Sequence, residues 1–146
     1  TAMMSDFNQA RRAIDQISEA GHRVSLDDFG IGYSSLQYLQ LLPVSKLKID
    51  HSFVRNILED TAAFKIVRTL LSLSRTLGLG CVVEGVETEA QMHILRTMGA
   101  RHIQGYLIDA PMPAASIPSA LGKTYDFTPA RGRPGPAEAI RQASVQ

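Results

Sequence analysis

The sequence predicts an α/β fold, part of a (β/α)8 barrel with about four parallel strands. Short apolar runs alternate with segments of helical periodicity, and strands separated by helices require crossovers and a parallel sheet. Polar residues fall at or just beyond the middle of successive strands and so face the C-terminal edge, as in barrel enzymes. The alternative, an open nucleotide-binding sheet, concentrates its chemistry in a Gly-rich first turn, and the sequence contains no GxGxxG or P-loop motif.

Composition agrees with one globular domain. The 146 residues are 45% hydrophobic and 20% charged, which is typical of a chain with an apolar core. The net charge of +1 gives no broad electrostatic attraction to a nucleic acid polymer or a membrane. No apolar run approaches the roughly 20 residues of a membrane helix. We therefore expect a cytoplasmic chain without a membrane segment.

The expected elements follow in order along the chain. Strands are predicted at 22–28, 46–50, 80–85 and 102–108. Helices are predicted from Ser5 to Gly21, from Ser34 or Ser35 to Leu42, as a turn near Phe53, from Asp60 to Leu77, and from a Thr88–Gln91 capping box to Gly99.

Two features are read as structural. The stretch 129–136 is rich in Pro and Gly, so residues 1–122 are expected to form the domain and 123–146 a poorly ordered tail. The single Cys81 lies in an apolar run and is interpreted as a buried, reduced thiol.

Acidic and amide side chains recur on successive predicted strands. They are Asp27 and Asp28, then Asp50, then Glu84 and Glu87, then Gln104, and a lysine, Lys48, accompanies them; all lie at or just beyond the middle of their strands. Because the carboxyl ends of parallel strands meet at one edge, the carboxylates converge and repel unless a cation lies between them. Hard oxygen ligands suit Mg²⁺ or Mn²⁺. On a regular strand Asp27 and Asp28 would point to opposite sides and bind from different directions.

Structural alternatives stay open for three of these residues. Asp28 and Asp50 could each cap the turn that follows. Lys48 could form a buried salt bridge with Asp27 or Asp50, or could hold a phosphate oxygen or the attacking water. The four histidines show no metal-ligand spacing.

Four linked motifs resemble those of the EAL family of bacterial cyclic di-GMP phosphodiesterases. They are DDFGIGYSSL (27–36), LKIDHSFV (47–54), VEGVETEAQ (83–91) and QGYLIDAPMP (104–113), and the likeness covers about residues 1–118. The resemblance implies a (β/α)8-type barrel, a site for two Mg²⁺ or Mn²⁺ ions, and hydrolysis of cyclic di-GMP to pGpG.

Roles for single residues also come from the resemblance. Asp27 corresponds to the ligand shared by two metals, and Asp28 to a ligand of the second. Glu84 corresponds to a second-metal ligand or general base. Lys48 corresponds to a residue beside the nucleophilic water, and Asp50 to a member of the same polar cluster. Glu87 and Gln104 correspond to the network around metal and substrate. The loop that couples the metal site to a dimer contact corresponds to Phe29, Gly30, Ile31, Gly32, Tyr33, Ser34 and Ser35.

The family's Glu-Ala-Leu signature, an Asn of its middle strand and a Glu-x-Thr-Glu strand belong upstream of Asp27. The resemblance therefore covers the C-terminal half of a barrel. We expect these 146 residues to be inactive alone, to self-associate through open strand edges, and to belong with an upstream sensor or diguanylate cyclase domain. A cut piece and a degenerate gene product both remain open, as does a non-catalytic cyclic di-GMP signalling or protein-interaction module.

Overall fold

The computed structural model describes residues 2–31, 39 and 41–124, which form a four-stranded parallel sheet in the order β1-β2-β3-β4. The strands are β1 (Ser25–Phe29), β2 (Lys46–Ile49), β3 (Gly80–Val83) and β4 (His102–Ile103). Strand order follows chain order, so each crossover adds a strand at the same edge. The predicted α/β class with four parallel strands is confirmed.

Helices connect the strands. They are α1 (Ala2–Glu19), α3 (His51–Arg55), α4 (Thr61–Thr76), α5 (Glu89–Thr97) and α6 (Ile117–Leu121), with a 3-10 turn η1 (Ala114–Ser116) before α6. Helices α4 and α5 begin after the predicted caps Asp60 and Thr88, whereas α1 begins before the predicted cap Ser5. The Asp60 carboxylate accepts from the Ala62 amide at 2.7 Å, and the Thr88–Gln91 capping box is formed. Most of the short helix expected before Pro43, and the tail from residue 125, lie outside the described residues.

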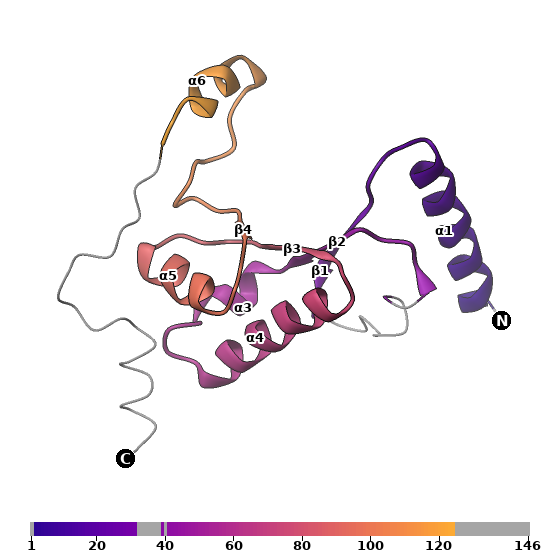
Figure 1. The fold of residues 1–146 in the computed structure, drawn as a ribbon, viewed down its shortest axis with the longest axis horizontal. Helices are drawn as coiled ribbons and strands as arrows, with labels where there is room; N and C mark the ends of the chain where they lie inside the picture. Colours follow the sequence, from indigo (N-terminus) through magenta and orange to yellow (C-terminus); the bar gives the residue numbers. More distant parts are fainter. Residues whose placement is uncertain (1, 32–38, 40, 125–146) are drawn as a thin grey trace.

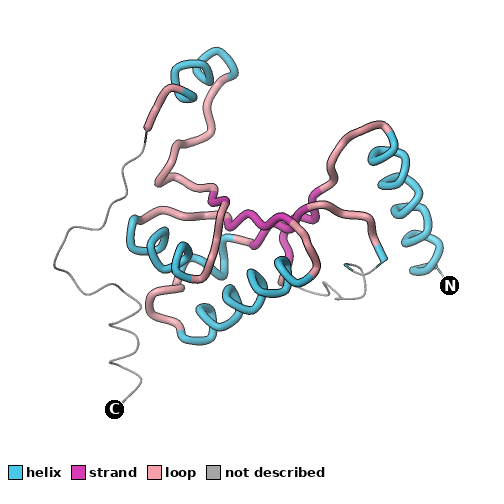
Figure 2. Tube along the Cα trace, viewed as in Figure 1, coloured by secondary structure: helices cyan, strands magenta, loops and turns pink. Residues whose placement is uncertain are grey.

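The main core lies between the sheet and three helices. In Figure 1, α3, α4 and α5 gather on one side of the sheet, while α1 and α6 stand away from it, and Figure 2 shows the same separation. Leu47 and Ile49 of β2 are fully buried, and Ile49 packs with Val67 of α4 and Val83 of β3. Because side chains alternate along a strand, Lys48 points to the face opposite the helices.

The last strand is shorter than predicted. β4 ends at Ile103, whereas a strand was expected to residue 108. The Val86 amide donates to the Gln104 carbonyl at 3.1 Å, and the Leu107 amide donates to the Val86 carbonyl at 3.0 Å. This arrangement brings Gly105 against the Val86 backbone, where a Cβ atom would collide. The close approach, which needs glycine, ends the regular ladder.

No helix in the described part of the chain combines the length and the apolar character needed to cross a bilayer.

Candidate metal centre

A bulge in β1 places two adjacent aspartates at the same edge. Leu26 pairs with Leu47 and Phe29 pairs with Ile49, so Asp27 and Asp28 together stand opposite Lys48. Asp28 has φ 50°, a left-handed conformation that Asp adopts more readily than most residues. The expectation that regular alternation directs the two carboxylates to opposite sides is wrong, because the bulge re-aims them.

Glu84 completes a group of three carboxylates. Its amide donates to the Ile49 carbonyl at 3.0 Å, which continues the pairing of β2 and β3 by one residue. One carboxylate oxygen each from Asp27, Asp28 and Glu84 lie within 4.8 Å of one another. Three carboxylates at this spacing repel unless cations compensate them.

Lys48 supplies part of that compensation. Its ammonium lies 2.8 Å from Asp27 Oδ1 and 2.7 Å from Glu84 Oε1, and its side chain is 25% exposed. The hydrogen bond from Lys48 is the main cause that lowers the pKa of Asp27, and the bonds to Asp27 and then Glu84 raise the pKa of Lys48. The sequence analysis offered Asp27 or Asp50 as the salt-bridge partner of Lys48. The structure shows a salt bridge to Asp27 and a second one to Glu84.

The bend after Glu84 depends on a glycine. Gly85 has φ 71°, and a Cβ atom there would collide with the Cβ of His51. The backbone directly after the third carboxylate therefore requires glycine.

Asp50 lies beside this group and caps a helix. It is 5% exposed, and its Oδ1 accepts from the Ser52 amide at 2.8 Å at the start of α3. The His51 Nδ1 lies 3.0 Å from Asp50 Oδ2. Burial acts to raise the pKa of Asp50, but the hydrogen bonds from Ser52 and His51 outweigh it and lower that pKa. The capping role left open by the sequence is thus present for Asp50.

The other predicted site residues lie around this edge. Glu87 and Gln104 are exposed, and neither belongs to the group of Asp27, Asp28 and Glu84. Their backbones are held by the Gln91 side chain at 2.9 Å and by the Val83 carbonyl at 2.9 Å.

Only the start of the predicted coupling loop is described. Phe29 is buried in the core, and Ile31 is exposed. Gly30 has φ 103° and packs so closely on the Phe53 ring that a Cβ atom would lie 2.8 Å from it. Gly32, Tyr33, Ser34 and Ser35 lie outside the described residues.

Sequence reasoning missed one positioning residue, Gln91. Besides closing the capping box, its Oε1 accepts from the Glu87 amide, and its Nε2 donates to the Val54 carbonyl at 3.3 Å. It therefore ties the turn after β3 to α3. The capping-box pattern identified the local bond, but a contact across 37 residues leaves no local signal.

The residues present fit a divalent cation. Three carboxylates against one ammonium leave net negative charge, and all candidate ligands are hard oxygen atoms. Such donors suit Mg²⁺, Mn²⁺ or Ca²⁺ better than softer metals. The lowered pKa of Asp27 favours its charged form, which is the form that binds a cation.

Comparison with known proteins assigns the class. The EAL domain family matches residues 1–111, and the chain belongs to that family. The chain is 45% identical over 114 residues to the bifunctional diguanylate cyclase/cyclic di-GMP phosphodiesterase MucR of Pseudomonas aeruginosa, covering 78% of this chain and 17% of MucR. It is 37% identical over 126 residues to the cyclic di-GMP phosphodiesterase NbdA of the same organism, covering 86% of this chain and 16% of NbdA.

Solved structures agree with that assignment. The MucR phosphodiesterase in complex with cyclic di-GMP superposes with a TM-score of 0.73 at 45% identity, covering 78% of this chain and 46% of that one. The EAL domain of Mycobacterium smegmatis DcpA gives a TM-score of 0.77 at 36% identity, covering 82% and 55%. The chain thus spans about half of these solved chains and under a fifth of the curated relatives. The resemblance to EAL domains and the expectation of a partial TIM-like barrel are confirmed.

Proposed function

We propose that this chain supplies one side of the active site of a cyclic di-GMP phosphodiesterase, which hydrolyses cyclic di-GMP to pGpG within a longer EAL-domain protein. One observation carries the proposal: Asp27, Asp28 and Glu84 converge within 4.8 Å in a chain of this family. Salt bridges to the partly exposed Lys48 stabilise the fold by at most about 1 kcal/mol each. Stability therefore gives little reason to gather three acids here.

The ligands proposed for Mg²⁺ or Mn²⁺ are Asp27, Asp28 and Glu84, with Asp27 shared between two ions. Divalent cations at such a site supply Lewis acidity toward the phosphodiester and lower the pKa of water. Glu84 is the candidate base for the proton of the attacking water. In this proposal Lys48 would orient that water and donate to a phosphate oxygen.

Other residues have supporting roles in this proposal. Asp50 contributes its charge to the cluster while it caps α3, and Glu87 and Gln104 complete the network around metal and substrate. The loop 29–35 couples the site to a dimer contact.

A non-catalytic cyclic di-GMP or protein-interaction module is the competing function. One observation favours it: Lys48 already satisfies Asp27 and Glu84 at 2.8 and 2.7 Å. In such a module the Lys48 ammonium would partly neutralise the three acids without a metal ion, and a ligand would bind without being cleaved.

The polypeptide 1–146 alone is proposed to be inactive. Three acids gather among its described residues, whereas the family resemblance assigns further ligands to strands upstream of Asp27. Self-association through the β1 and β4 edges, an upstream sensor or cyclase domain, and a cytoplasmic location remain predictions.

The deciding experiment replaces Asp27 by Asn in the natural-length protein that carries this chain. Chromatography of cyclic di-GMP and pGpG measures turnover with Mg²⁺ or Mn²⁺. We expect the variant to keep less than a tenth of the rate, because a neutral amide compensates divalent charge poorly, whereas the control Asp15→Asn on α1 keeps full rate. Equal turnover by Asp27→Asn would refute the metal role. Binding of cyclic di-GMP without cleavage by the unmodified protein would favour the module.

A further inference from the structure

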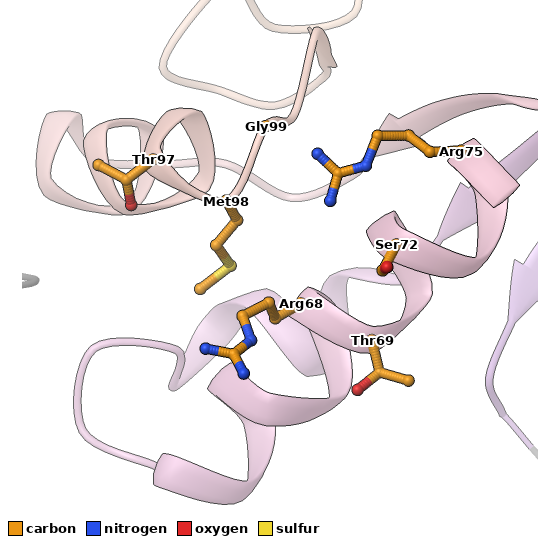
Figure 3. A pocket seen from close by; sticks show the side chains of 7 residues that line it. All are labelled: Arg68, Thr69, Ser72, Arg75, Thr97, Met98 and Gly99. Carbon is orange, nitrogen blue, oxygen red and sulfur yellow. The ribbon is translucent and has the colours of Figure 1, made fainter.

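We propose that the groove between α4 and α5 binds a small phosphate-bearing anion, which is a site separate from the carboxylate group. The groove has a volume of about 530 Å³. Its lining consists of Arg68, Thr69, Ser72 and Arg75 from α4 with Thr97, Met98 and Gly99 at the end of α5. Figure 3 shows the Arg75 side chain extending from α4 toward Gly99, while the Arg68 guanidinium lies apart from it, beyond the end of the Met98 side chain.

The charge of the groove is one-sided. The lining contains two arginines and no carboxylate, although the whole chain has a net charge of only +1. Within the described residues neither Arg68 nor Arg75 forms a salt bridge. Guanidinium groups bind phosphate oxygens through paired hydrogen bonds, and the hydroxyls of Thr69, Ser72 and Thr97 add donors.

A second cavity extends the positive surface. It has a volume of about 310 Å³, shares Arg75 and Gly99 with the first, and adds Arg101 and His102 near the start of β4. Apolar side chains, including Leu71 and Leu79, line part of it. Together the two cavities reach the size range of small-molecule sites, so the phosphate of a nucleotide fits the chemistry as well as free orthophosphate does.

Helix stabilisation accounts for only part of this arrangement. Arg75 lies in the last turn of α4, where a cation stabilises the helix dipole. Arg68 lies in the middle of that helix and gains nothing from this effect. Because α4 and α5 flank the inner strand β3, strands added at β1 or β4 would not come between these two helices.

Arginine modification provides a residue-resolved test in the natural-length protein without divalent cations. The protein is labelled with phenylglyoxal in the absence and in the presence of orthophosphate, GMP or uncharged guanosine, at constant ionic strength. Peptide mass spectrometry then measures the extent of labelling at each arginine. We expect saturable protection of Arg68, Arg75 and Arg101 by orthophosphate or GMP, and none by guanosine. Stronger protection by GMP identifies a nucleotide as the source of the phosphate, and equal protection identifies free phosphate. Protection of none of these arginines, or equal protection of exposed Arg96, overturns the site.

Calorimetric titration with the better probe gives a second test. The double variant Arg68→Gln/Arg75→Gln should weaken binding at least about tenfold, which is 1.4 kcal/mol. Arg96→Gln, which removes the same charge from α5 outside both cavities, should leave it unchanged. Arg75→Lys keeps charge and fold but loses the paired geometry, so it should bind more weakly than the unmodified protein. Unchanged affinity in both Arg75 variants, or equal loss in Arg96→Gln, contradicts the proposal.

Discussion

Replacing Asp50 by Asn and by Ala separates its capping role from its proposed part in catalysis. Its carboxylate accepts from the Ser52 amide at 2.8 Å in a position that is 5% exposed. Losing such a cap costs about 0.5–2 kcal/mol, and Asn caps nearly as well as Asp. We therefore expect Asp50→Ala to lower the free energy of unfolding by about 2 kcal/mol, and Asp50→Asn to lower it by under about 0.5 kcal/mol.

The Asp50→Asn substitution keeps the capping oxygen and removes the negative charge. The negative charge of Asp50 acts on Asp27, since it tends to raise the pKa of that carboxylate. We expect turnover of cyclic di-GMP by Asp50→Asn to fall at least about tenfold, which corresponds to 1.36 kcal/mol of transition-state stabilisation.

Urea titration monitored by circular dichroism measures stability, and chromatography of pGpG measures turnover, both in the natural-length protein. A folded Asp50→Asn protein with full turnover would refute the catalytic part and leave Asp50 as a helix cap only. The pH dependence gives a check on sign. Because the folded pKa of Asp50 is lowered from 3.8, its stabilisation is complete well above that pH and is lost as pH falls through the lowered value. Asp50→Asn should lack this loss.

Three further perturbations test the surrounding geometry. Gly85→Ala should abolish turnover and cost at least about 1–2 kcal/mol, because its Cβ would meet His51; Gly78→Ala, with a similar φ of 68° and open space around its Cβ, should keep turnover. Lys48→Met should reduce turnover at least about a hundredfold with under about 1 kcal/mol of stability lost; near-normal turnover would favour a purely structural lysine. Because burial raises the pKa of Cys81, iodoacetamide should react with it more slowly than with free cysteine near neutral pH, and Cys81→Ser should keep turnover.

Local sequence rules identified most of the fold because short-range physics decides those elements. Asp60 and the pair Thr88–Gln91 cap helices through bonds to residues two or three positions away. The end of β4 was missed because it depends on the Gly105 backbone meeting Val86, a contact that periodicity does not encode.

The sequence indicated which residues gather at the candidate site, but not how their side chains are arranged. Strand ends indicated that Asp27, Asp28 and Glu84 would share one edge, because parallel strands present their carboxyl ends together. The sequence left open whether the Asp50 carboxylate accepts from the Ser52 amide, and it did not indicate that Lys48 bonds to both Asp27 and Glu84. Both choices depend on hydrogen-bond competition at the sheet edge, which residue spacing alone does not settle.

The unusual backbone at this edge supports a functional interpretation of the acids. Asp28 is the one non-glycine residue with positive φ in the described part of the chain, and it lies within the carboxylate group. A left-handed residue costs about 1–2 kcal/mol unless its surroundings support it. Here Phe29 is buried directly after it, and Gly30 packs against Phe53. Packing of the adjoining residues thus holds a conformation that brings two like charges together, which folding alone would disfavour and a bound cation would compensate.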